Sequence, residues 1–211
     1  MPRPRSLELV RGLDRRSAAT VMLAGAVLSL GFIQLLATPL QDLNAIDVQV
    51  LAVRTALYLA PLVVTLLQLL RQGPLLIEDA RLLKRLGGRG WRLRLPQVLA
   101  MALSTLVLVL YFESAAIVAA VITKPEADTL GELRFLIGNL DPLLFLFTLA
   151  KAALFGAIAA MLCLRQGTRL SRRNSAARVM SEAIVVSTAA LLAIDLAWVL
   201  AADPLQTAGR G

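Results

Sequence analysis

Five long apolar runs, separated by short polar segments, make up most of this chain. Each run has about the 20 residues that a helix needs to cross the hydrocarbon core of a bilayer. The runs cover roughly residues 18–38, 48–70, 95–123, 142–164 and 179–202. Of the 211 residues, 58% are apolar and 17% are charged, whereas about a quarter of a soluble domain is charged. We therefore expect an all-α membrane protein, with one five-span domain over 18–202 and a polar tail over 203–211.

Two segments outside these runs have the pattern of short amphipathic helices. In residues 1–17 the apolar side chains fall on one face and arginines surround them, as in a helix that lies on an anionic leaflet. A basic flank that only orients the first span is the alternative interpretation. Residues 74–87 follow a break at Gly73-Pro74 and carry an apolar stripe at helical spacing. They predict a separate short helix at the membrane face.

The charges of the loops predict the topology. Lysine and arginine are concentrated in residues 1–16, 71–94 and 165–178. Residues 39–47 have neither, and residues 124–141 have two basic against four acidic side chains. Because basic loops stay in the cytoplasm, the N-terminus is predicted inside and the C-terminus outside. Five spans satisfy this alternation at every loop.

Four apolar runs each contain a charged residue, namely Arg54, Glu113, Lys151 and Asp195. Counting from the outer loops at about 1.5 Å per residue places all four roughly 10–17 Å below the outer boundary. A lone charge at such a depth costs about 2.5–3.5 kcal/mol on insertion scales, so we expect the four to pair with one another. Two interpretations stay open. The layer either fixes how the spans pack, or lines a polar cavity that handles a charged head group or moves with gating.

Composition argues against several other classes of protein. The chain has one cysteine and no histidine, so an intrachain disulfide is impossible, and neither a zinc nor a haem site, nor any other cofactor, is expected. The net charge of +8 resides in the loops, without the aromatic-interleaved basic surface typical of nucleic-acid binding. There is no nucleotide-binding loop. An intramembrane enzyme acting on lipids lacks a visible set of catalytic residues.

The last two runs carry a series of residues at a characteristic spacing. A lysine precedes a Phe-Gly pair, a cysteine and a glycine; a basic linker, a second short motif and a deep aspartate follow. These residues are Lys151, Phe155, Gly156, Cys163, Gly167, Arg178, Ala183, Val185, Val186, Ser187 and Asp195. In this pattern, and in the Leu-Pro-Gln-Val-Leu-Ala stretch over 95–100, the chain resembles permeases of the MlaE/YrbE type. Those are the membrane subunits of MCE lipid-transport ABC systems.

The resemblance implies a phospholipid permease of the bacterial inner membrane that is not itself an enzyme. In such systems two permeases form a dimer, a cytoplasmic ABC ATPase drives transport, and a periplasmic MCE-domain protein exchanges the lipid. Lys151 and Asp195 match the intramembrane charges of that family. Residues 74–87 become the expected coupling helix for the ATPase, through Glu78, Asp79, Arg81, Lys84 and Arg85.

The chain also departs from the family pattern in its second run. Arg54 is displaced by about one helical turn and lacks the acidic neighbour that the family has; we hypothesise that Glu113 replaces this acid. The stretch from Pro61 to Gly87 is several residues short. A degenerate permease that anchors partner subunits without transporting lipid is therefore the alternative function.

Overall fold

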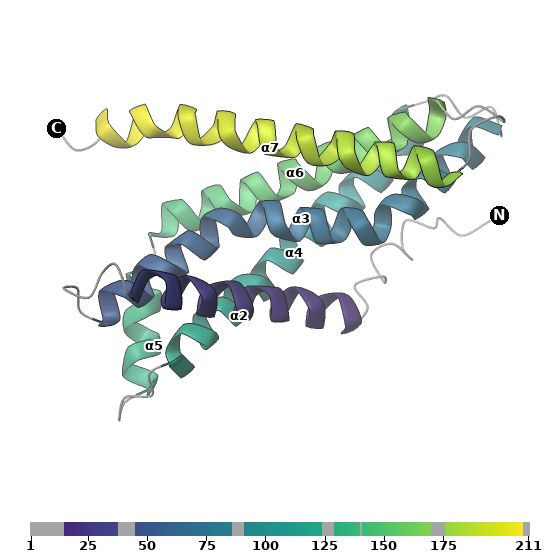
Figure 1. Cartoon of the computed structure of the whole chain (residues 1–211). Coiled ribbons are helices and arrows are strands. Elements are labelled where there is room, and N and C mark those ends of the chain that lie inside the picture. Colours follow the sequence, from purple (N-terminus) through teal and green to yellow (C-terminus); the bar gives the residue numbers. More distant parts are fainter. Residues whose placement is uncertain are drawn as a thin grey trace.

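A computed structural model of the chain describes residues 15–37, 45–85, 91–123, 129–139, 141–169 and 176–208 (Figure 1). These residues form α-helices, apart from Asn139, which lies in a turn, and Asp141, which has no regular secondary structure. The helices are α2 (Arg15–Ala37), α3 (Ala45–Arg85), α4 (Trp91–Thr123), α5 (Thr129–Gly138), α6 (Pro142–Arg169) and α7 (Ala176–Ala208). Five of them are long and apolar enough to cross a membrane, as the apolar runs predicted. Most of the predicted interfacial helix, residues 1–14, lies outside the described residues.

Two predicted boundaries are wrong. The helix α3 does not break at Gly73-Pro74; it continues as one helix of 41 residues with Pro61 and Pro74 inside it. At about 1.5 Å per residue it is about 60 Å long, twice the thickness of the hydrocarbon core. Residues 74–85 therefore extend the second span and do not form a separate helix. The predicted tail likewise begins later, because α7 runs to Ala208.

The long helices run side by side, and the two ends of the bundle differ (Figure 1). We call the end with the basic loops the inner end and the opposite end the outer end. Between α3 and α4 the pairing is antiparallel. Near the outer end the Gln49 amide donates to the Ala120 carbonyl at 3.1 Å, and near the inner end the Gln97 amide donates to the Asp79 carboxylate at 3.3 Å. The α2 helix approaches α4 closely, since a β-carbon on Gly25 would collide with the backbone of Phe112.

A buried polar cluster joins α3, α4 and α6. The Gln68 amide nitrogen donates to the Ser104 hydroxyl at 2.5 Å, and the Thr105 hydroxyl donates to the Gln68 amide oxygen. On α6, a β-carbon at Gly156 would lie 2.5 Å from the Thr105 Oγ1 atom. Glycine therefore lets α6 reach the hydrogen-bonded side chains, and small residues at helix contacts in membranes commonly have this role.

The last helix, α7, packs on α6 and α3 and leaves much of its surface uncovered. Its buried residues, such as Ala183 and Leu191, belong to an apolar cluster with Leu69 of α3 and Phe155 of α6. Toward its C-terminal end α7 separates from α6 and α3 (Figure 1). This separation occurs at the outer end.

Candidate functional site

The centre of the site is an ion pair between α6 and α7. The Lys151 ammonium contacts the Asp195 carboxylate, and both side chains are largely buried, with 6% and 17% of their surface exposed. The Lys151 Nζ atom also lies 5.5 Å from the ring centroid of Phe155, one turn farther along α6. A cation in this position over an aromatic ring gains further stabilisation. Two of the four charged residues that were expected to pair with one another thus lie in contact.

The ion pair joins α6 and α7 at one position along their length. Lys151 is ten residues from Asp141, and Asp195 is 13 residues before Ala208. Removal of one member would leave a charge in the membrane interior, at a cost of about 3–5 kcal/mol for a buried pair. The pair therefore fixes α7 on α6 at one level, while the outer part of α7 is free of that restraint.

Arg54 and Glu113 do not join this pair in the described part of the chain, so the structure does not bring the four charges into one network. Arg54 is exposed, and its Nη2 atom donates to the Asn139 carbonyl at 3.0 Å. Glu113 is 3% exposed, and neither of its carboxyl oxygens has a hydrogen-bond partner among the residues that the structure describes. Counting residues gives the depth of a side chain but not the face of the helix on which it lies. Arg54 is on the outside of α3 and Glu113 is in the interior of the bundle, which separates them.

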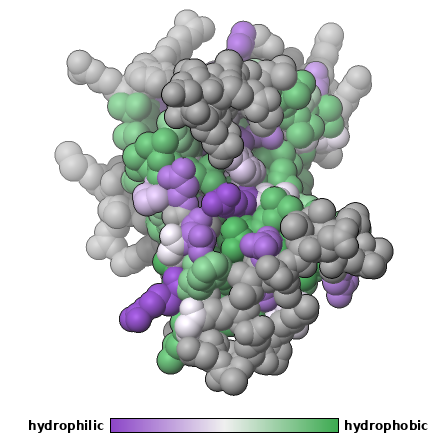
Figure 2. Space-filling view, turned by 90° about the vertical axis from the view of Figure 1, so that its left-hand side faces the viewer, coloured by the Kyte–Doolittle hydropathy of each residue, from purple (hydrophilic) through white to green (hydrophobic). Residues whose placement is uncertain are grey.

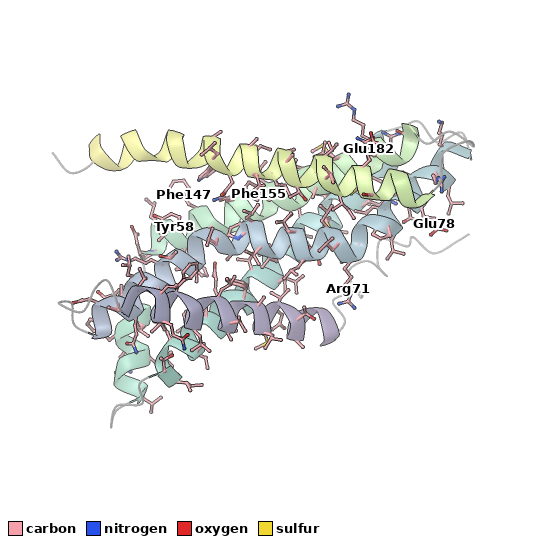
Figure 3. The ribbon with its side chains drawn as sticks, viewed as in Figure 1. Tyr58, Arg71, Glu78, Phe147, Phe155 and Glu182 are labelled. Carbon is pink, nitrogen blue, oxygen red and sulfur yellow. The ribbon has the colours of Figure 1, made fainter. Side chains whose placement is uncertain are left out.

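The predicted coupling residues lie on the inner extension of α3. Glu78 is exposed at the inner end of the bundle (Figure 3), while the Asp79 carboxylate accepts the hydrogen bond from Gln97 described above. Lys84 donates to the Thr168 carbonyl of α6 at 2.7 Å. Arg81 is half-buried, and the side chain of Arg85 lies outside the described residues. Within this set, the structure leaves Glu78 as the acidic side chain most open to a partner.

The glycines and the cysteine of the C-terminal pattern have packing roles that spacing alone did not reveal. A β-carbon at Gly167 would collide with Ala80 and Ile77, so this glycine lets the ends of α3 and α6 touch. Cys163 is fully buried in the inner apolar cluster. A search for charged residues alone does not find the buried Gln68, although a glutamine inside an apolar run is itself a signal of interhelical hydrogen bonding.

No group of three or more histidine, cysteine or acidic side chains that could hold a metal ion occurs among the residues that the structure describes. The family model of Permease MlaE matches residues 91–201, more than half of the chain, and this stretch contains both members of the ion pair. Among curated proteins, none matches the chain.

Proposed function

The chain belongs to the MlaE permease family, whose members are permease components of lipid ABC transporters, and we propose that it passes phospholipid between the bacterial inner membrane and a periplasmic MCE-domain protein. A separate cytoplasmic ABC ATPase supplies the energy. Two copies of the permease form the transmembrane dimer.

The observation that carries this proposal is the Lys151–Asp195 pair. It lies inside the family match, between two membrane-crossing helices, where a charge is tolerated chiefly for a function. A pair that holds α7 to α6 at a single level allows the outer part of α7 to move relative to the bundle. In the proposed cycle such movement opens and closes the path of the lipid toward the periplasmic partner.

The inner extension of α3 is the proposed site of contact with the ATPase. It is packed on α6 through Gly167 and tied to it through Lys84, so force applied there reaches two membrane helices together. Glu78 is exposed beside Leu75 and Leu82, which are 53% and 38% exposed. An apolar surface with one acidic side chain suits a protein partner better than lipid head groups.

One observation favours the second candidate, a membrane scaffold that anchors partners without transport. Because α3 continues without a break through Arg85, the predicted coupling residues cannot turn independently of the second span. Transport is the better-supported proposal, because the matching family is one of permeases and the match covers the ion pair.

Copurification followed by ATPase measurement tests the proposal. The full chain is coexpressed with a candidate ABC ATPase, and ATP hydrolysis by the complex is measured in nanodiscs. We expect Lys151→Ala and Asp195→Ala to change the hydrolysis rate, whereas Arg134→Ala, on the exposed surface of α5, serves as the matched control and leaves it unchanged. Transport is contradicted if no ATPase binds, or if lipid transfer is complete when both charges are absent.

A further inference from the structure

Neither the ion pair nor the buried polar cluster accounts for the carboxyl group of Glu113. This side chain is 3% exposed, and neither of its oxygens has a hydrogen-bond partner among the described residues. Val109 and Ala116, about one turn away on α4, and Phe112 beside it belong to an apolar cluster to which α2, α3 and α6 contribute. A bare carboxylate in such surroundings is so costly that the group becomes neutral instead, and a carboxylate becomes neutral by binding a proton.

A second buried oxygen without a partner lies outward from Glu113 on α2. The helices α2 and α4 both cross from the inner to the outer end, so they run parallel (Figure 1). A β-carbon on Gly25 would collide with the backbone of Phe112, which places these two residues at the same level. Ser29 is one turn outward from Gly25, and its hydroxyl is fully buried and has no partner among the described residues.

A third such oxygen belongs to Gln49 of α3, farther outward. Its amide nitrogen donates to the Ala120 carbonyl, whereas its Oε1 atom is buried and has no partner within the described part of the chain. Ala120 is seven residues beyond Glu113 on the same face of α4, which is about 10 Å along the helix. We call Glu113, Ser29 and Gln49 the outer polar track, because their unpaired oxygens lie at successive levels toward the outer end.

Glu113 is also closer to the outer end of α4 than to its inner end. The helix ends at Thr123, ten residues away, and begins at Trp91, 22 residues away. At about 1.5 Å per residue these distances are about 15 Å and about 33 Å. Figure 2, which looks onto the outer end, shows hydrophilic side chains gathered near its centre and hydrophobic ones around them. Glu113 is therefore the deepest point of a polar route that starts at the outer end.

We propose that Glu113 is a proton-binding site that exchanges with the outer solution along the outer polar track. A hydronium ion of that solution gives up its proton and leaves water, and a new O–H bond forms on a carboxyl oxygen of Glu113. A hydroxyl such as that of Ser29 both donates and accepts hydrogen bonds, so it suits a position on this route. Loss of the proton would place a charge beside the close contact of α2 and α4, so the outer pH acts on that contact. This inference does not depend on lipid transport.

The other titratable groups near this part of α4 are exposed or already paired. They are Asp47, Arg54 and Tyr58 of α3, Tyr111 of α4 itself, Arg134 of α5, and Lys151 of α6 with its partner Asp195 of α7. The membrane-crossing part of α2, Ala18–Leu36, contains no titratable residue. A basic partner for Glu113 is therefore absent from the described residues.

A proton suits this site better than a metal cation. A calcium or magnesium ion takes about six or more oxygen ligands around one point. The outer polar track has one carboxyl group, one hydroxyl and one amide oxygen, at different levels along the bundle. A proton needs a single carboxyl oxygen, and Glu113 supplies it.

Infrared spectroscopy of the full chain in nanodiscs tests the proposal. A protonated carboxyl group has a carbonyl stretching band separate from the bands of carboxylates and amides. We expect this band at neutral pH in the parent, its loss in Glu113→Gln, and no change in the control Glu182→Gln, which alters an exposed carboxylate. Exclusion of a thiol reagent from the buried Cys163 verifies that each variant is folded. In the parent alone, the band should disappear in strongly alkaline solution.

Exchange into heavy water tests the route. Deuterium shifts the band to lower frequency, and the half-time of this shift measures access to Glu113. We expect Ser29→Ala to lengthen the half-time about five-fold, the change for one lost hydrogen bond of about 1 kcal/mol. Ser114→Ala, which alters an exposed serine of α4, should leave it unchanged.

Three results would overturn the proposal. The first is a parent chain without the band at neutral pH, or with a band that Glu113→Gln retains. The second is loss of the band when sodium or magnesium chloride is added at constant pH, which would indicate a metal cation in place of the proton. The third is an equal half-time for Ser29→Ala and the parent, which would show that protons do not reach Glu113 along the outer polar track.

Discussion

Removal of one member of the buried ion pair should destabilise the protein, and removal of both should not. In Asp195→Leu the Lys151 ammonium remains 5% exposed without its counter-charge. Breaking such a pair costs about 3–5 kcal/mol. The contact with the Phe155 ring is present in both parent and variant and cancels in the comparison, so the net loss is about 3–5 kcal/mol. In Lys151→Met/Asp195→Leu no unpaired charge remains, and the stability should return to within about 1 kcal/mol of the parent.

Cys163 provides the assay, because it is the only cysteine of the sequence and is fully buried. A thiol-reactive fluorophore labels it only when the inner apolar cluster opens, so labelling during a temperature ramp reports unfolding in detergent. At about 2–4 °C per kcal/mol for a chain of this size, the single variant should unfold about 10 °C below the parent. A single variant with the parent midpoint, or a double variant as unstable as the single, would refute this reasoning about the pair.

Three further substitutions test other parts of the structure. Glu78→Lys should weaken binding of the ATPase in a pull-down while membrane insertion stays intact. Glu182→Lys, also exposed near the inner end, is the control. Normal ATPase binding by Glu78→Lys would show that α3 is not the docking surface. Gly156→Ala should lower stability by about 1–3 kcal/mol because its β-carbon collides with α4, whereas Gly31→Ala, with nothing within 4 Å, should be neutral or stabilising in the same thiol-labelling assay. Glu113→Leu should raise the unfolding temperature because it removes a buried carboxyl group that has no partner, and a fall would reveal an interaction that this structure does not contain.

The number and position of the spans could be predicted from the sequence because bilayer thickness fixes the length of an apolar run. The end of α3 could not be predicted from the sequence. Gly73-Pro74 is a strong local signal for a break, but Leu76, Ile77 and Ala80 are buried against the neighbouring helices. Burial along the whole extension stabilises a continuous helix more than one proline disfavours it.

The ion pair could be predicted in part. The number of residues from the end of a span gives the depth of a side chain, and this count places Lys151 and Asp195 at one level. The direction of a side chain depends on helix rotation, which the sequence of a largely apolar helix constrains weakly. Residue counting places Arg54 and Glu113 at a similar depth, but Arg54 is exposed and Glu113 is buried in the bundle.

The most direct test of the central claim is ATP-dependent lipid transfer by the reconstituted complex. The full chain is assembled with the proposed ATPase and MCE-domain partners in liposomes that contain fluorescent phospholipid, and transfer to acceptor vesicles is recorded after addition of ATP. A lipid permease predicts transfer that requires ATP and is lost in Lys151→Met/Asp195→Leu, even though that variant is folded by the thiol-labelling assay. Transfer at the parent rate by this folded variant, or an assembled complex that hydrolyses ATP and moves no lipid, would contradict the account.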